Sequence, residues 1–321
     1  MKYGTIPGID QQVSRLAQGT IMISSERLDE SFRLLDTAFE AGINLFDTAR
    51  CYGEDNERTA GRWVNARGIR EGVVMIAKGA HPSDGRNRCN AEDITLELTA
   101  SLERFAFDYF DLYILHRDDP AVPVEEIVDV LNDHLRAGRI RAFGGSNWTH
   151  ERLREANAYA AANGLVPFAV SSPNFSLAVS YQPMWPDCLS IQGPDGAAAR
   201  EWYAQTNMPL VTWSSVARGF FSGRFTSAGY ERHKDVLEAC AIESFCSPDN
   251  VRRLERVEQL AAEKGLSVPQ VALAYVLCFP LNIFALVGAA TPDEVRTNLA
   301  ALDVALSPDE MAWLNLERDN R

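Results

Sequence analysis

Four side chains suited to proton transfer follow short apolar runs of this sequence. Asp47 ends the run INLF, Lys78 ends VVMIA, and His116 ends DLYIL. Tyr52 stands five residues after Asp47, in the stretch DTARCYGEDNE. One polar residue after an apolar run is usually a turn residue. An acid, an amine and an imidazole after three consecutive runs favour a catalytic site instead.

These four residues together could protonate a carbonyl oxygen. A cation stabilises a phenolate, so we expect the Lys78 ammonium to lower the pKa of Tyr52. Asp47 would pair with Lys78 and hold it in place. His116 would donate a hydrogen bond to the same substrate oxygen. The group predicts a general acid acting on an oxygen whose carbon receives a hydride, or the reverse alcohol oxidation.

Such residues need a scaffold that gathers the ends of strands. Short apolar runs alternate with stretches of helical periodicity, a pattern typical of parallel strands buried on both faces. The expected strands are Val13–Ala17, Ile43–Phe46, Val73–Ala77, Leu112–Leu115, Ile140–Phe143, Phe168–Val170, Leu210–Trp213 and Ile283–Val287. The expected helices are Leu28–Ala41, Ala91–Arg104, Val124–Ala137, Glu151–Asn163, Ala197–Thr206 and Pro248–Glu263.

This alternation predicts an α/β fold, a (β/α)8 TIM barrel that forms a single domain over residues 1–321. The strand ends would then share one rim, where barrel enzymes keep their active sites. The main rival is a doubly wound open sheet, which usually carries a GxGxxG turn that this chain lacks. The segments Ser180–Asp195 and Ser227–Asn250 are expected to be loops extending from the rim.

Composition narrows the classes of partner. The formal net charge of −13 argues against nucleic acid, which needs a basic surface. No signal peptide precedes the first strand, and the six cysteines stand singly, which favours a reduced cytoplasmic chain. The uncharged stretch Val268–Ala290 is expected to be a buried helix, a turn and a strand rather than a membrane span. A monomer is the default expectation, with a homo-oligomer left open.

With these motifs in the same order, the chain resembles the aldo-keto reductases over nearly its full length. The motifs that carry the resemblance are VSRLAQGT (13–20), GINLFDTARCYGEDNE (42–57), VVMIAKGA (73–80), DLYILHRDDP (111–120), AGRIRAFGGSNWT (137–149), VTWSSVARGFFSGRF (211–225) and VGAATPDEVRTNLAAL (287–302). The resemblance implies that Asp47, Tyr52, Lys78 and His116 form the catalytic tetrad, with Tyr52 as proton donor. It implies reduction of aldehydes, ketones, sugars or steroid-like ketones, or oxidation of the corresponding alcohols.

The same resemblance implies a nicotinamide cofactor and the residues that hold it. Ser146 and Asn147 would bind the carboxamide, and Trp213 would lie against the nicotinamide ring. The pyrophosphate loop would contain Ser214, Val216, Arg218, Ser222 and Arg224. The adenosine-phosphate segment would contain Gly288, Ala289, Thr291, Glu294 and Asn298, with the N-terminus of a helix near Thr291 offering free N–H groups to an anion.

Three positions depart from the family pattern. Ser172 stands where a glutamine often binds the carboxamide. Gly288, Ala289 and Glu294 replace residues that often bind a 2′-phosphate, and a glutamate would repel that phosphate. NADP(H) is favoured, because family members with a glycine at the position of Gly288 still use it. NAD(H) remains open. Cys51, directly before Tyr52, is either a passive rim residue or a thiol whose oxidation closes the site.

The substrate is the least defined part of the hypothesis. Rim residues that could contact a small carbonyl or alcohol substrate are Met22, His81, Arg117 and Trp148. The five histidines form neither HxH nor HExxH, so no metal site is expected. The main alternative function is a regulatory subunit that binds the cofactor as a redox sensor, as the resemblance includes ion-channel subunits. A barrel isomerase or hydrolase would leave Trp213 and 288–298 without a purpose.

Overall fold

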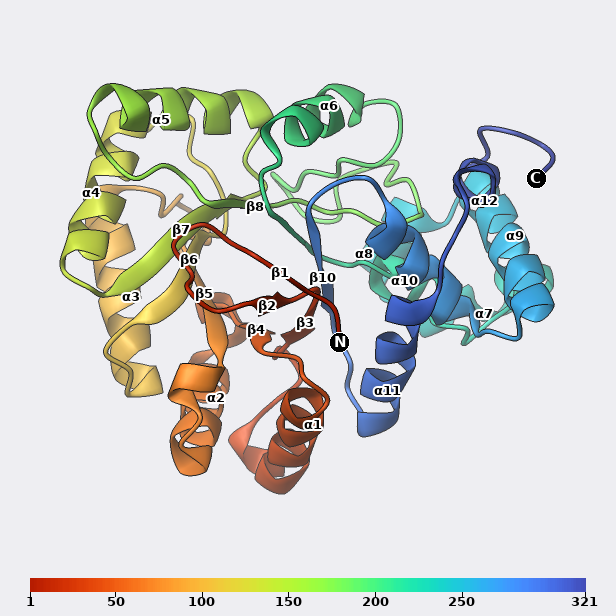
Figure 1. Ribbon diagram of the computed structural model, residues 1–321, viewed down its shortest axis with the longest axis horizontal. Helices are drawn as coiled ribbons and strands as arrows, with labels where there is room; N and C mark the ends of the chain where they lie inside the picture. Colours follow the sequence, from red (N-terminus) through yellow and green to blue (C-terminus); the bar gives the residue numbers. More distant parts are fainter.

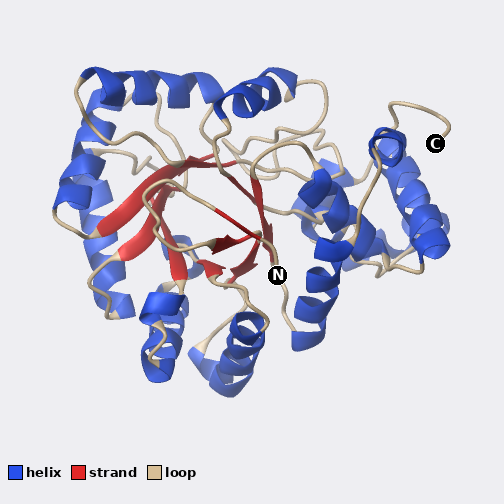
Figure 2. Ribbon diagram, in the orientation of Figure 1, coloured by secondary structure: helices blue, strands red, loops and turns tan.

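Eight parallel strands close into a barrel surrounded by helices in the computed structural model, which describes residues 1–321 (Figures 1 and 2). Around the barrel the strands run β10–β3–β4–β5–β6–β7–β8–β9. Their bounds are β3 Leu16–Gly19, β4 Leu45–Asp47, β5 Val74–Gly79, β6 Phe110–Leu115, β7 Ile140–Ser146, β8 Val170–Ser172, β9 Leu210–Thr212 and β10 Ile283–Val287. The predicted (β/α)8 TIM barrel is therefore confirmed, and each strand overlaps or adjoins its expected run.

The helical layer follows the predicted alternation, with helices that the sequence did not predict, α2 and α12 among them. Its helices are α1 Leu28–Glu40, α2 Glu54–Arg67, α3 Ala91–Phe105, α4 Val124–Arg136, α5 His150–Ala162, α6 Ala197–Thr206, α9 Pro248–Lys264, α10 Val268–Cys278, α11 Pro292–Ala300 and α12 Pro308–Leu314. The sequence did not predict α2, because its buried face has few large apolar residues. A Cβ on Gly61 would lie 2.4 Å from the carbonyl oxygen of Phe105, so a glycine allows α2 to approach α3 closely.

An antiparallel hairpin covers the N-terminal end of the barrel. Its strands, β1 (Tyr3–Gly4) and β2 (Val13–Ser14), cross the barrel in Figure 1. Ile6 and Val13 pack into the interior against inward-facing strand residues such as Leu45 and Ile114. This plug makes the interior a packed core, so the opposite end of the barrel is left for function.

The two expected rim loops differ in the structure. Residues 180–195 are irregular, as predicted. The expectation of a loop over Ser227–Asn250 is wrong, because this stretch contains α7 (Tyr230–His233), α8 (Ala239–Phe245) and the start of α9. The short helices bury Leu237, Ala241 and Phe245, so apolar packing orders a segment that the sequence pattern left undefined.

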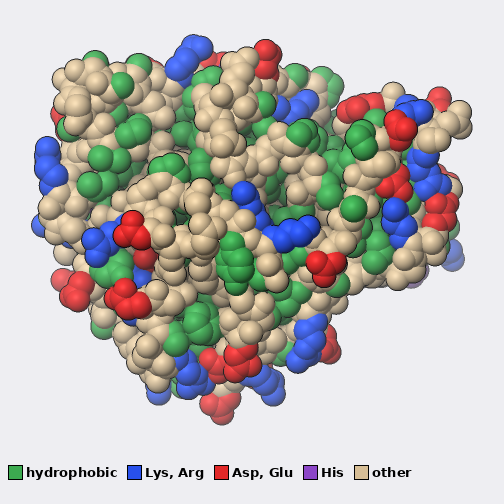
Figure 3. Space-filling model, in the orientation of Figure 1, with side chains coloured by type: hydrophobic (Ala, Val, Ile, Leu, Met, Phe, Trp, Pro, Cys, Tyr) green, Lys and Arg blue, Asp and Glu red, His purple; other side chains and the backbone are tan.

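Val268–Ala290 forms α10 and β10, as expected. None of the helices combines the length and the apolar character needed to cross a membrane. Acidic and basic side chains are interspersed over the face shown in Figure 3.

Candidate active site

The structure brings the four proton-transfer residues together at the C-terminal end of neighbouring strands. Asp47 ends β4, Lys78 lies in β5, and His116 follows β6. Lys78 and Asp47 are buried and form an ion pair, and the Lys78 Nζ also donates to the Thr48 carbonyl at 3.2 Å. The same Nζ lies 5.6 Å from the centroid of the Tyr52 ring. The ammonium group therefore joins the acid and the phenol.

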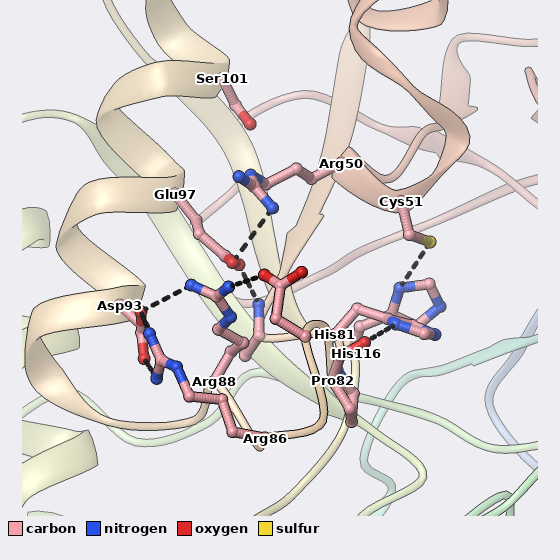
Figure 4. A network of polar contacts seen from close by, with 12 residues as sticks. Arg50, Cys51, His81, Pro82, Arg86, Arg88, Asp93, Glu97, Ser101 and His116 are labelled. Carbon is pink, nitrogen blue, oxygen red and sulfur yellow. Dashed lines mark hydrogen bonds and ion pairs between the residues drawn. The ribbon is translucent and has the colours of Figure 1, made fainter.

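Tyr52 is carried by a single 3₁₀ turn, Arg50–Tyr52, between β4 and α2. Gly53 ends this turn with a φ of 100°, a conformation that a side chain would strain. Arg50 Nη1 lies 3.2 Å from the buried Glu97 carboxylate, whose other oxygen accepts the Ala80 N–H at 2.7 Å (Figure 4). Glu97 therefore ties the turn that carries Tyr52 to the end of the strand that carries Lys78.

The electrostatics of the site correct one expectation. The removal of water and the nearby Asp47 carboxylate raise the pKa of Tyr52 well above its usual value. The expected lowering by Lys78 is not found, because burial and the negative charge of Asp47 outweigh the effect of the ammonium on Tyr52. Burial, with the charges of Lys78 and Arg117, lowers the pKa of His116 well below its usual value. At neutral pH the site thus holds a protonated phenol and a neutral imidazole.

The four expected substrate contacts occupy different environments. The His81 ring lies edge-on to His116 with centroids 5.0 Å apart, so it belongs to the mouth of the site. Met22 lies beside Gly288, at the start of the predicted adenosine-phosphate segment. Arg117 is buried and donates to the backbone of His116 and of Pro186, at 2.8 and 3.3 Å, which anchors the 180–195 loop.

The expectation for Trp148 is wrong. Its side chain is 1% exposed, and its ring packs 4.9 Å from that of Phe168. The chain bends after β7 into α5, which turns this ring toward the helical layer and away from the rim.

The expected carboxamide site lies at the ends of β7, β8 and β9. Ser146 Oγ donates to the Ser172 carbonyl at 2.9 Å, and Asn147 Nδ2 donates to Ser146 Oγ at 3.1 Å. Asn174 Nδ2 donates to the Trp213 carbonyl at 3.0 Å, which leaves its buried Oδ1 without a partner. The buried Nε1 of Trp213 also lacks a partner. An orphaned acceptor and donor at one strand edge fit the donor and acceptor of a planar amide.

The segment after β9 has the backbone of an anion site. Four residues here have φ between 46° and 91°, namely Ser214, Ala217, Arg218 and Gly219. Three of them are not glycine, and such a concentration is unusual. Backbone N–H groups in irregular turns of this kind can converge on phosphate oxygens, although the Ala217 N–H already donates to the Ser214 carbonyl at 2.7 Å. Val216 and Ser222 lie half-buried on this segment, and Arg224 is exposed. Two of the five predicted pyrophosphate residues, Ser214 and Arg218, have these left-handed dihedrals, and Val216, Ser222 and Arg224 lie on the same segment.

Arg218 already has partners within the chain. Its guanidinium pairs with Glu238 at 2.7 Å and covers the Trp185 ring at 4.8 Å. The Trp185 ring lies 6.0 Å from that of Trp213. The 180–195 loop and the α7–α8 segment therefore meet over the end of β9.

The predicted helix N-terminus is confirmed at α11, where Thr291 is the N-cap and Pro292 the first helical residue. Thr291 Oγ1 accepts the Glu294 N–H at 3.2 Å, and the Glu294 carboxylate accepts the Ala290 N–H at 2.7 Å. Ala289 is buried with its carbonyl held by Gln18, while Gly288 is exposed and Asn298 lies half-buried on the helix. The Glu294 carboxylate thus brings a negative charge to the N-terminal end of this helix.

Sequence reasoning assigned no role to three residues of this region. Asn174 follows a predicted strand like the other polar residues, and that position was the signal available. Trp185 lies in a long loop whose path the sequence does not show. Glu97 lies in mid-helix, and nothing in the helical pattern distinguishes it from a surface acid.

Comparisons with known proteins agree with this geometry. Norsolorinic acid reductase A of Aspergillus parasiticus is 29% identical over 300 residues, covering 88% of this chain and 69% of its own. The oxidoreductase YrpG of Bacillus subtilis is 27% identical, covering 98% and 95%. A probable voltage-gated potassium channel subunit beta of Oryza sativa subsp. japonica is also 27% identical, covering 95% and 92%.

Structure and family comparisons point the same way. The crystal structure of the thermostable aldo-keto reductase Tm1743 with the inhibitor epalrestat has a TM-score of 0.74 at 23% identity, covering 98% of this chain and 99% of its own, which shows a shared fold. The model of the Aldo/keto reductase family matches residues 15–315. This chain therefore belongs to the aldo/keto reductase family.

Proposed function

We propose that this protein reduces aldehyde or ketone carbonyls with a nicotinamide cofactor, or oxidises the corresponding alcohols, with Tyr52 as the general acid or base. The observation that carries the proposal is the meeting of Tyr52 with the Lys78–Asp47 pair and with a neutral His116 at the barrel rim. Oxidoreductases among the relatives support a redox role.

Each residue of the group has one task in this reaction. Tyr52 donates its phenolic proton to the substrate oxygen, and the oxygen gains that proton as its carbon is reduced. The neutral His116 imidazole donates an N–H hydrogen bond to the same oxygen and disperses its developing negative charge. The Lys78 ammonium stabilises the phenolate left on Tyr52, and Asp47 holds that ammonium in place. The cofactor, when bound, supplies the hydride.

We infer that NAD(H) is favoured over NADP(H), in contrast to the preference drawn from the sequence. The Glu294 carboxylate accepts the Ala290 N–H at 2.7 Å and so brings negative charge to the N-terminus of α11. A second anion at this end meets repulsion, and its N–H partner is already taken. Ala290, beside it, has no side chain that could bind a phosphate.

The substrate panel follows from the aromatic rings at the rim and from the relatives. Norsolorinic acid reductases and an aryl-alcohol dehydrogenase from Phanerodontia chrysosporium are similar to this chain. The Trp185 and Trp213 rings, 6.0 Å apart, offer apolar surface near the site. Aromatic aldehydes and ketones therefore lead the panel, with aliphatic aldehydes and aldoses after them.

The test is a fluorescence titration of the purified protein with NADH and with NADPH, followed by initial rates on the panel. We expect binding of both cofactors, tighter for NADH, and turnover of at least one carbonyl compound. Binding without turnover of any compound would favour the alternative of a redox-sensing regulatory subunit. Binding of neither cofactor would contradict both functions.

A further inference from the structure

Cys51, His81 and His116 converge at the mouth of the site, from three different segments of the chain. We propose that these three side chains bind a divalent transition-metal ion, zinc in particular, and that the bound ion inhibits carbonyl reduction. The inhibition rests on the function proposed above, whereas the binding does not.

The spacing of the ligand atoms carries the proposal. One ligand atom from each residue lies within 4.8 Å of the others. Cys51 Sγ and His116 Nδ1 are 3.6 Å apart, and both are drawn in Figure 4. With Zn–S near 2.3 Å and Zn–N near 2.0–2.1 Å, tetrahedral geometry separates sulfur and nitrogen by about 3.6 Å. One edge of the coordination polyhedron therefore exists before any metal binds.

His81 has the second contact that a zinc-binding histidine usually makes. Its Nδ1 lies 2.9 Å from the Pro82 carbonyl oxygen, which can accept a hydrogen bond but cannot donate one. Nδ1 must therefore carry the proton, and Nε2 keeps the lone pair that a metal requires. Backbone carbonyls commonly fix the tautomer of metal-binding histidines in this way.

The charges around the cluster permit a dication. Two cations lie beside the cluster, Lys78, which is paired with Asp47, and Arg117, which has no carboxylate partner. Cys51 binds as the thiolate and releases one proton to solvent, so the ligand set supplies one negative charge. Cys51 is exposed, which gives the ion a path from solvent. A water molecule would complete the four ligands, as in zinc sites that remain open.

A metal ion bound here would stop the reaction from the substrate side. It would hold the His116 ring by Nδ1 and fill the mouth between Cys51 and His81, next to Tyr52. The expected cofactor site lies across the barrel, on β7 to β9. We therefore expect inhibition that is competitive with the carbonyl substrate and leaves NADH affinity unchanged.

Binding is tested first with Co²⁺ on the reduced, metal-free protein. We expect a thiolate-to-cobalt charge-transfer band in the near ultraviolet and the visible bands of tetrahedral cobalt. The Cys51→Ser protein should lose the charge-transfer band. Two control variants remove a cysteine and a histidine outside the cluster, Cys240→Ser and His233→Ala, and should keep the spectrum. An absent band in the unaltered protein, or an unchanged band in Cys51→Ser, would overturn the proposal.

The zinc affinity is then measured by competition with a chromogenic chelator. Loss of an outer hydrogen-bond partner alone lowers metal affinity about 10–100-fold, so loss of the thiolate in Cys51→Ser should lower it at least about 100-fold. His81→Ala should also weaken binding, while the two control variants should match the unaltered protein. Equal zinc affinity in all the proteins would refute the site.

Inhibition is scored for each protein against its own rate without metal. Zinc should abolish most of the activity of the unaltered protein and much less of that of Cys51→Ser. Bound zinc that leaves the rate unchanged would refute the inhibition. Metal binding in a protein that turns over no carbonyl compound would instead refute the proposed function and leave the metal site supported.

Discussion

Replacing Asp47 by Asn would leave the Lys78 ammonium buried without its carboxylate. The two side chains are 1% and 4% exposed, and the Lys78 ammonium would keep only neutral acceptors, the new amide oxygen and the Thr48 carbonyl 3.2 Å from Nζ. Removal of one partner from a buried ion pair typically costs about 3–5 kcal/mol. We expect Asp47→Asn to lower the free energy of unfolding by about 3 kcal/mol at pH 7.

Thermal unfolding measures this loss. An unfolding entropy of about 2.1 cal/mol/K per residue amounts to about 0.7 kcal/mol/K for 321 residues. A loss of about 3 kcal/mol therefore predicts a decrease in Tm of about 4–5 °C.

A double-mutant cycle separates the ion pair from general damage to the barrel. Lys78→Met alone leaves Asp47 buried and unpaired, whereas Asp47→Asn with Lys78→Met removes both charges. The double variant should be more stable than the sum of the single losses by at least about 2 kcal/mol. Losses that simply add, or an Asp47→Asn loss below about 1 kcal/mol, would refute the reasoning.

Two further predictions concern pH and cofactor choice. Because the pKa of Tyr52 is raised, Tyr52 keeps its proton, and because that of His116 is lowered, His116 stays a neutral imidazole that can still donate one N–H. Initial rates of reduction should be constant from about pH 6 to 9, while alcohol oxidation should rise with pH; a decline of reduction centred near pH 7 would contradict this. Glu294→Arg should improve the affinity for NADPH relative to NADH at least about tenfold. A tenfold change in affinity corresponds to about 1.4 kcal/mol, and the exchange replaces repulsion of the 2′-phosphate by attraction. Glu294→Gln, which removes only the charge, should improve it less in the same fluorescence titration, and an unchanged ratio would show that Glu294 does not read the 2′ position.

The barrel could be predicted because its signals are local. Each buried strand is a run of three to seven residues with turn residues around it, and parallel strands place their ends on one rim. That rule was enough to place Asp47, Lys78 and His116 together. Helix α2 was not predicted, because its contact with the backbone of Phe105 is made by Gly61. A glycine does not contribute to an apolar pattern in the sequence.

The environment of each side chain could not be predicted in the same way. The raised pKa of Tyr52 depends on how Asp47 and Lys78 share their charges, which requires their positions in space. Trp148 follows two rim residues in the sequence yet packs against Phe168, because the chain bends there into α5.

Ligand sets built from separate segments also leave no motif in the sequence. Cys51, His81 and His116 follow three different strands and show no metal-binding spacing. The contact between Glu294 and Ala290 is local, but its effect on cofactor choice depends on where the end of α11 lies relative to the site.

The role of Tyr52 as proton donor is tested most directly with Tyr52→Phe. The exchange keeps the aromatic ring beside Lys78 and removes only the hydroxyl group. We expect NADH binding within about twofold of the unaltered protein and a rate of carbonyl reduction that is about 10²–10⁴-fold lower, measured in single turnovers. A Tyr52→Phe protein that reduces its best substrate as fast as the unaltered protein would contradict the proposed mechanism.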